Sequence, residues 1–150
     1  MLWLPVMIGI GSFVLDRLSK IFVSTNMRLG QSIPVIENIF HITFKTNDGA
    51  AFSILSGKVP FLIVSTLLII GLLVAFIIVK KPKNKIFCIA VSLIISGALG
   101  NLVDRIALGH VIDFLDARWI DFPIFNVADI CVVIGAALFC IYIFKSTDFE

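Results

Sequence analysis

Charged residues are scarce in this chain: Asp, Glu, Lys and Arg make up 15% of its 150 residues, whereas 59% of the residues are hydrophobic. Soluble domains contain about 25% charged and about 45–50% apolar residues, and the mean hydropathy here is +1.10. This composition predicts an integral membrane protein with a single domain over residues 1–150. The net charge of +2 forms no basic stripe interleaved with aromatic residues, so we expect no nucleic-acid partner.

Cysteine and histidine are also few. Cys88, Cys131 and Cys140 fall in apolar stretches, with neither CxxC spacing nor a neighbouring histidine, so neither a zinc site nor a disulfide framework is indicated. We expect them to pack as small apolar residues. His41 and His110 are isolated, which favours structural, hydrogen-bonded roles over metal ligation. We therefore expect no metal and no cofactor.

Long hydrophobic runs are what the chain has in abundance. They predict four membrane-spanning helices, at about 2–24, 59–79, 86–103 and 127–144. Pro60 suits the first turn of the second helix. No charged residue precedes the first run, so it is not typical of a cleaved signal peptide, and we expect it to be retained. Within that run, Asp16 and Lys20 are spaced for a stabilising pair on one helix face, with Lys20 extending outward.

The topology follows from the densest basic cluster, which lies between the second and third runs at residues 80–85. Lysines close to helix ends mark the cytoplasmic side, so we expect this loop and both termini in the cytoplasm. The segments of about 25–58 and 104–126 are then extracytoplasmic.

The first extracytoplasmic segment has the period of a strand. Apolar and more polar residues alternate from Ile39 to Lys45. Asn47-Asp48-Gly49 follows and has the chemistry of a turn, so we expect a small hairpin or sheet on the outer membrane surface. In the third hydrophobic run, small residues recur at steps of four, at Ser92, Ser96 and Gly100. Such a stripe allows another helix to approach closely.

Two aspartates, Asp113 and Asp129, lie beside the last two hydrophobic runs. A charged side chain near hydrocarbon is costly unless it is paired or functional. In the expected topology both acids belong to the outer face, where they could meet. Two carboxylates at close range share a proton, so that one acts as a base on water while the other donates to a carbonyl. This is the chemistry of aspartic proteases.

Each aspartate also has a structural interpretation. Asn126 is typical of a helix N-cap, and Asp129 three residues later could complete a capping box; the spacing alone fits cap and catalyst equally well. Asp113 could instead face solvent from a short strand. Asp116 and Asp121 are the nearest rival acids, and both are interpreted as surface loop residues.

Two further clusters have both a structural and a functional interpretation. Arg105 either pairs with Asp104 at the carbonyl end of the third helix, or it and Asn101 hold substrate carbonyls or orient the aspartates. The segment from Asn47 to Ser53 is either a turn before a short helix, or a place where small residues such as Gly49 let backbone approach a peptide.

Taken together, five segments resemble the lipoprotein signal peptidase family, the bacterial type II signal peptidases. They are Asp16 with Lys20, Asn47 to Ser53, Gly100 to Arg105, Val111 to Phe114, and Phe125 to Asp129. No single segment is decisive, but five in this order around four spans are very specific. One departure is Arg17, where the family usually has glutamine; it bears only on the packing of the first helix.

The resemblance implies an aspartyl endopeptidase of the bacterial cytoplasmic (inner) membrane, which cuts the signal peptide from prolipoproteins just before a diacylglyceryl-modified cysteine. It implies an all-α membrane fold of four helices with a small extracytoplasmic β-cradle and a site near that face. The expected partners are these substrates and membrane lipids, and we expect a monomer. The catalytic pair maps onto Asp113 and Asp129. Supporting positions are Asn47, Gly49, Asn101, Arg105 and Asn126, and mainly structural ones are Asp16, Lys20 and Asp104.

Two other classes of protein fit part of the pattern. In a small transporter or proton-coupled channel, the two aspartates would bind or relay ions, but transporters usually show repeats and broken helices that converge on the midplane. A non-enzymatic assembly subunit would use the small-residue stripe as its interface. That interpretation leaves the paired acids without a role.

Overall fold

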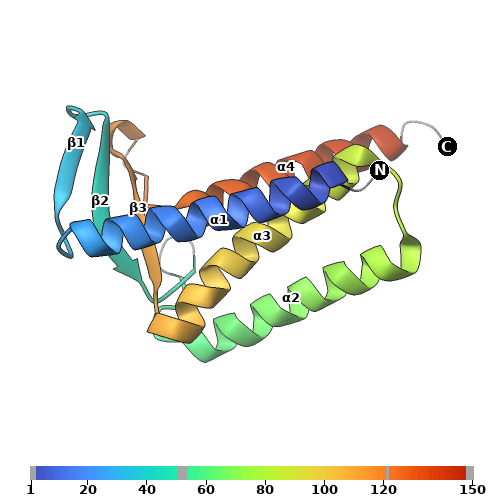
Figure 1. Cartoon of the computed structure of the whole chain (residues 1–150), viewed down its shortest axis with the longest axis horizontal. Helices are drawn as coiled ribbons and strands as arrows, with labels where there is room; N and C mark the ends of the chain where they lie inside the picture. The colour runs from blue at the N-terminus through green and yellow to red at the C-terminus, as the bar shows by residue number, and fades with distance from the viewer. Residues whose placement is uncertain (1–2, 51–53, 121, 148–150) are drawn as a thin grey trace.

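The computed structural model describes residues 3–50, 54–120 and 122–147. Its helices are α1 (Trp3–Asn26), α2 (Val59–Lys80), α3 (Lys85–Leu108), the short 3-10 helix η2 (Arg118–Ile120) and α4 (Val127–Thr147). Its strands are β1 (Ser32–Ile36), β2 (Phe40–Asn47) and β3 (Val111–Ala117). The long helices run along one another and the strands lie across one end of them (Figure 1). The fold is therefore mostly helical with a small antiparallel sheet.

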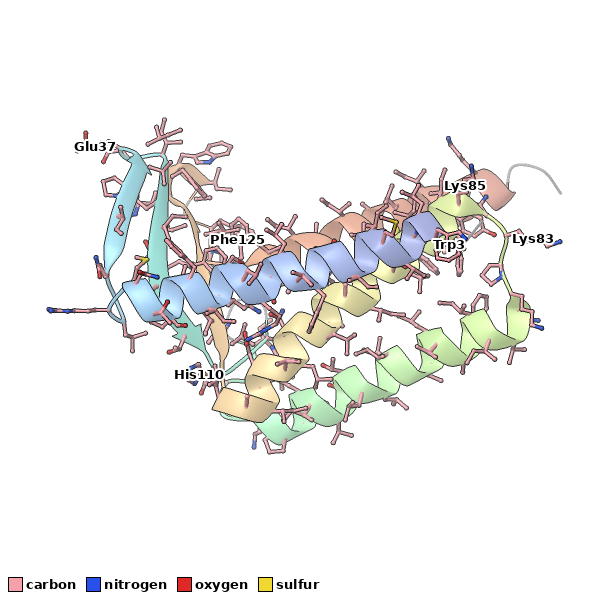
Figure 2. The ribbon with its side chains drawn as sticks, viewed as in Figure 1. Trp3, Glu37, Lys83, Lys85, His110 and Phe125 are labelled. Carbon is pink, nitrogen blue, oxygen red and sulfur yellow. The ribbon has the colours of Figure 1, made fainter. Side chains whose placement is uncertain are left out.

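Within the described residues, three helices are long and apolar enough to cross a membrane: α2, α3 and α4. The remaining long helix, α1, has 24 residues but carries Asp16, Arg17 and Lys20 in its middle. The start of α1 and the end of α4 lie at the end of the bundle opposite the sheet (Figure 1). Lys83 and Lys85 lie there too, near Trp3, whereas Glu37 marks the far tip of the sheet (Figure 2).

The helices begin and end close to the expected residues, with one clear difference. Pro60 lies in the first turn of α2, and the side chain of Asn84 accepts a hydrogen bond from the backbone N–H of Phe87 at the start of α3. However, α3 continues to Leu108 and ends at Gly109, whose φ of 76° is a left-handed cap. Residues 104–108, which we expected in the outer segment, are therefore the last turn of this helix.

The sheet has the strand order β1-β2-β3, with both pairs antiparallel. The strand expected from Ile39 to Lys45 is confirmed as β2. The position of the hairpin turn was predicted wrongly, since β1 and β2 are joined through Asn38, whose φ is 59° and whose side chain tolerates that conformation. Asn47-Asp48-Gly49 instead leads away from β2. Phe52 and Ser53 lie outside the described residues.

The sheet is fixed to the bundle by apolar packing at its centre. Val23 and Met27 of α1 form a buried cluster with Ile112 and Phe114 of β3. All four are at most 9% exposed. This packing holds β3, and therefore Asp113 between the last two residues, in a fixed place above the helices.

Helix α3 is the centre of the bundle and packs against α1, α2 and α4. Its small residues permit this close approach, as the sequence predicted. A Cβ on Gly97 would come within 2.3 Å of the backbone oxygen of Ala128 in α4, and one on Gly100 within 2.5 Å of Asp16 Oδ2 in α1. Gly100 thus leaves the space in which the carboxylate of Asp16 is buried.

Candidate active site

A cavity of about 630 Å³ lies between α2, α3 and α4 at the sheet end of the bundle. Its walls are mostly apolar, but several polar side chains converge in it. These are Lys45, Asn47, Thr66, Asn101, Arg105, Asp113 and Asp129. Most of these residues were already candidate site residues from the sequence, although they come from segments as far apart as Asn47 and Asp129. Lys45 and Thr66 had not, because an isolated lysine or threonine beside an apolar run carries no distinguishing pattern.

Asp113 is contributed by β3, and its side chain is 3% exposed. It does not face solvent, so the structural interpretation of this residue was wrong: β3 is buried on both faces through most of its length. Asn126 Nδ2 donates to Asp113 Oδ1 over 2.7 Å. Burial, followed by the nearby charge of Asp129, raises the pKa of Asp113 to about 7, although hydrogen bonds from Asn126 and Asn47 act in the opposite direction.

Asp129 lies in the first turn of α4, where it completes a capping box. The backbone N–H of Asp129 donates to Asn126 Oδ1 over 3.0 Å, and the backbone N–H of Asn126 donates to Asp129 Oδ2 over 3.1 Å. The other oxygen, Oδ1, accepts from Asn101 Nδ2 at 2.7 Å, and Asp129 lines the cavity. The cap and the cavity position therefore coexist in one residue.

Two amide side chains connect the acids. Asn126 is fully buried, and its Nδ2 lies within hydrogen-bond distance of Asp113 Oδ1, of Asn101 Oδ1 at 3.1 Å and of the Ile112 carbonyl at 3.3 Å. Asn101 then reaches Asp129. Asp113 and Asp129, from different elements, are thus held at the same cavity by a continuous chain of hydrogen bonds.

Arg105 reaches the other side of the cavity. Its Nη2 donates to the carbonyl oxygen of Gly49 over 2.9 Å, so it does not pair with Asp104 as in the structural interpretation. Asn47 Oδ1 accepts from the backbone N–H of Gly49 over 2.9 Å. These contacts fix residues 47–50 beside the cavity, with a guanidinium and an amide at its edge.

Asp16, Lys20 and Asp104 form a buried cluster between α1 and α3, below the aspartates. Lys20 Nζ lies 3.0 Å from Asp16 Oδ2 and 2.9 Å from Asp104 Oδ2. The expectation that Lys20 extends outward was wrong: it is 0% exposed, because two carboxylates inside the bundle attract it. Arg17, also on α1, pairs with Asp104.

Asp116 was misread as a surface loop residue. It lies in β3 and is buried, with Thr43 Oγ1 donating over 2.6 Å and Arg118 Nε over 3.0 Å to its Oδ2. Burial acts to raise its pKa, but these two donors and the Arg118 charge outweigh it, and the pKa is lowered. This network faces away from the cavity lining. Asp121 lies outside the described residues.

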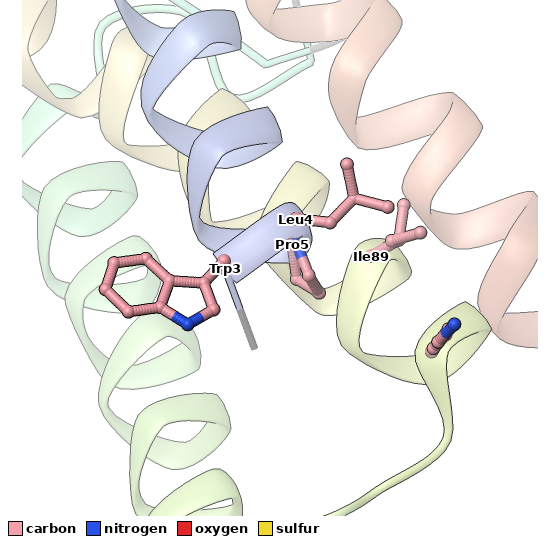
Figure 3. Close-up of a pocket in the computed structure, with 5 residues that line it drawn as sticks. Trp3, Leu4, Pro5 and Ile89 are labelled. Atoms are coloured by element: carbon pink, nitrogen blue, oxygen red, sulfur yellow. The ribbon is translucent and has the colours of Figure 1, made fainter. Parts of the chain in front are cut away.

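The other features of the described chain add no chemistry at the aspartates. A smaller cavity of about 230 Å³ at the opposite end of the bundle is lined by Trp3, Leu4, Pro5, Lys85 and Ile89 (Figure 3). Cys88 is buried in an apolar cluster, as expected, and Cys131 is buried too, whereas Cys140 is exposed. Across residues 3–50, 54–120 and 122–147, no group of three His, Cys, Asp or Glu side chains is arranged to hold a metal ion.

Comparison with known proteins shows the family to which the chain belongs. The family model described as signal peptidase (SPase) II matches residues 8–145. The chain belongs to the signal peptidase II family. It is therefore a hydrolase of the peptidase class, in lipoprotein processing, which favours the enzyme over the transporter and the assembly subunit.

Individual relatives match over nearly their whole length. The lipoprotein signal peptidase of Clostridium acetobutylicum is 42% identical over 97% of this chain and 94% of that protein. The one from Nostoc punctiforme is 43% identical over 97% and 90%, and the one from Staphylococcus aureus 40% identical over 95% and 89%. A bacterial membrane enzyme solved by the in meso method at 2.3 Å superposes with a TM-score of 0.92 at 38% identity, covering 97% of this chain and 91% of that one. The fold of this membrane enzyme thus extends over nearly the whole chain.

Proposed function

We propose that this chain is an aspartic endopeptidase that removes the signal peptide from diacylglyceryl-modified prolipoproteins, cutting just before the lipidated cysteine. One observation carries the proposal: Asp113 and Asp129 line the same cavity and are connected by the amides of Asn101 and Asn126. The lipoprotein signal peptidases among its relatives support the substrate class.

The two carboxyl groups differ in a way that suits acid and base roles. Asp113 holds the shared proton at neutral pH, because burial raises its pKa to about 7. Asp129 is the base, because N–H donors from Asn101 and from the backbone of Asn126 hold its two oxygens in place at the cavity.

Hydrolysis then proceeds in two steps. Asp129 takes a proton from a water molecule whose oxygen attacks the scissile carbonyl carbon, while Asp113 gives its proton to the carbonyl oxygen, so that a gem-diol forms. In the second step the C–N bond breaks: Asp129 gives its proton to the leaving amine and Asp113 recovers a proton from the diol. The products are a peptide carboxylic acid and a free amine on the lipidated cysteine.

The supporting residues hold the substrate and the dyad. Asn101 and Asn126 orient the carboxylates, and Arg105 fixes the backbone around Gly49. Asn47 then offers an amide to the substrate backbone from that segment. Holding the reacting atoms in position contributes as much to the reaction rate as the acid–base step does. Loss of any of these groups therefore lowers turnover without removing the dyad.

The cavity is open to lipid on one side. Its walls include Ile69 of α2 and Val133 and Ile134 of α4, and all three are exposed side chains on the outside of the bundle. The acyl chains of a substrate enter sideways between these helices, while water reaches the aspartates from the sheet end.

Four membrane spans fit this arrangement, with α1 as the fourth. Its acid and its lysine, Asp16 and Lys20, are buried against α3, whereas apolar side chains such as Ile10, Leu18 and Phe22 are exposed to the surroundings. The basic loop at residues 80–85 and both termini are then cytoplasmic, and the sheet is extracytoplasmic, in the bacterial cytoplasmic membrane. One chain supplies every group of the site, so a monomer suffices.

The deciding experiment incubates the purified protein in lipid or detergent with a diacylglyceryl-modified prolipoprotein and follows the size of the product. We expect Asp113→Asn and Asp129→Asn each to lose about 10²–10⁴-fold in rate, the value of a positioned acid or base. The matched control is Asp116→Asn, on the same strand as Asp113 but bonded to Thr43 and Arg118, which should still cleave. Cleavage that survives either dyad substitution refutes the proposed mechanism. Absence of cleavage by a folded wild-type protein refutes the proposed substrate.

A further inference from the structure

The buried lysine of α1 makes a contact that charge balance alone does not require. Lys20 Nζ is surrounded by three acceptors: Asp16 Oδ2 at 3.0 Å, Asp104 Oδ2 at 2.9 Å and Asn101 Oδ1 at 3.0 Å. An ammonium group has three N–H donors and no acceptor. Two of the three neighbours are ion-pair partners, and the hydrogen bond goes to Asn101, the amide that contacts Asp129.

This contact helps to fix the orientation of the Asn101 amide. Its oxygen faces Lys20, which can only donate, and its nitrogen faces Asp129 Oδ1 at 2.7 Å, which as a carboxylate can only accept. A flipped amide would place oxygen against oxygen at Asp129 and nitrogen against nitrogen at Lys20. Together with Asn126 Nδ2, which also donates to Asn101 Oδ1, the lysine thus fixes which side of Asn101 donates to the dyad.

The surrounding charges allow Lys20 to do this inside the bundle. Two carboxylates, Asp16 and Asp104, are matched by two cations, Lys20 and Arg17, since Arg17 also pairs with Asp104. Arg17 makes no contact with Asn101; its other hydrogen bond goes to the Gly100 carbonyl at 3.4 Å. Both cations therefore neutralise the carboxylates of Asp16 and Asp104, but of the two only Lys20 donates a hydrogen bond to the Asn101 amide.

We propose that Lys20 is a positioning residue for the Asp113 and Asp129 dyad, acting through the amide of Asn101. The inference rests on the proposed function and adds α1 to the elements that control it. Lys20 contacts neither substrate nor water in this role; it orients the amide that orients the base, and its positive charge acts on Asp113.

The charge of Lys20 gives the role a measurable signature. Lys20 lowers the pKa of Asp113, whereas burial and Asp129 raise it. The charged groups around the lysine are Asp16 and Arg17 on α1, Asp104 and Arg105 on α3, Asp113 on β3 and Asp129 on α4. Removing only the lysine charge should therefore move the alkaline limb of the kcat/KM profile, which reports Asp113, to higher pH.

The test uses the full-length protein and the lipidated prolipoprotein. We expect Lys20→Met to lower kcat by about tenfold to a hundredfold, the effect of misplacing a reacting group, with little change in KM and with the alkaline limb at higher pH. Arg17→Gln is the matched control: it removes a neighbouring cation from the same cluster, and we expect lower stability with kcat and the alkaline limb close to wild type.

A double substitution separates positioning from folding. Asp16→Asn with Lys20→Met keeps the cluster neutral, and the new amide oxygen can still accept from the Ala128 N–H, which Asp16 Oδ1 accepts at 2.9 Å. We expect this variant to regain thermal stability but not kcat or the wild-type alkaline limb. If it regains all three, Lys20 is only structural and the inference is wrong.

The outcome is distinguishable from failure of the proposed function. If Asp113→Asn or Asp129→Asn still cleaves, the dyad itself is refuted. If both dyad variants are inactive and Lys20→Met keeps the wild-type kcat and pH profile, only the role of Lys20 is refuted.

Discussion

Substituting alanine at Gly97 should displace the first turn of α4, which contains Asp129. An added Cβ would lie 2.3 Å from the Ala128 backbone oxygen and 2.8 Å from Val132 Cγ2. A close carbon-to-oxygen contact is about 3.3 Å, so α3 and α4 must separate by about 1 Å at the residue that precedes Asp129. Overpacking of this size costs about 1–3 kcal/mol of stability, and a displacement of about 1 Å near reacting groups costs about a hundredfold in rate.

Two other glycines provide matched controls for this prediction. A Cβ on Gly135 would meet the Ala90 oxygen and Ile94 Cγ1 at 2.8 Å. Gly135→Ala therefore also overpacks α3 against α4, but at a point roughly 9 Å along α4 from Asp129. It should lower stability while reducing cleavage much less. A Cβ on Gly71 would meet nothing within 4 Å, so Gly71→Ala should be neutral or slightly stabilising.

The assay measures initial cleavage of the lipidated prolipoprotein by the folded fraction of each variant, alongside its thermal unfolding. Of these variants, we expect only Gly97→Ala to lose about a hundredfold in cleavage rate. If Gly97→Ala cleaves as fast as Gly71→Ala, the close approach of α3 does not hold Asp129 in place. If Gly97→Ala and Gly135→Ala lose equal activity, the loss reflects stability and not the position of the dyad.

Two further predictions concern protonation and topology. The pKa of Asp113 is raised from 3.8 to about 7, so the folded protein binds this proton more tightly than the unfolded chain, and the free energy of unfolding should fall as pH rises between those values, by at most about 4 kcal/mol. Urea unfolding at pH 5 and pH 8 measures this, and the pH dependence should shrink in Asp113→Asn; an unchanged dependence there contradicts the assignment. Topology reporters placed at Lys83 and at Glu37, at opposite ends of the molecule (Figure 2), should report cytoplasm and extracytoplasm respectively. An extracytoplasmic signal at Lys83 overturns the whole arrangement.

The parts of the fold that could be predicted are those encoded by local patterns. The length and composition of an apolar run indicate a helix without reference to any other part of the chain. The alternation from Ile39 to Lys45 likewise indicated β2 from one segment alone. The capping box of Asn126 and Asp129 is likewise local, since its atoms are three residues apart. The hairpin turn was misplaced because Asn38 has no glycine beside it, while Asn47-Asp48-Gly49 has the stronger turn composition.

The errors about Lys20 and Asp116 share one cause: each concerns a polar side chain with a partner that is distant in sequence. Lys20 was expected to extend outward, but its partner Asp104 and the Asn101 amide lie on another helix. Asp116 was assigned to the surface, but Thr43 and Arg118 enclose it. Burial of a charge depends on what is packed around it, and a single segment of sequence does not contain that information.

The sequence by itself determined the membrane class, the long helices, one strand and the candidate residues, because hydropathy, periodicity and motif spacing are properties of contiguous segments. Only the tertiary structure decided that Asp113 faces a cavity, that Asn101 and Asn126 connect it to Asp129, and that Lys20 of α1 contacts the same chain of amides. The physical reason is that hydrogen-bond direction and desolvation act over a few ångströms in space. Residues 20, 101, 113, 126 and 129 come within that range only when α1, α3, β3 and α4 pack together.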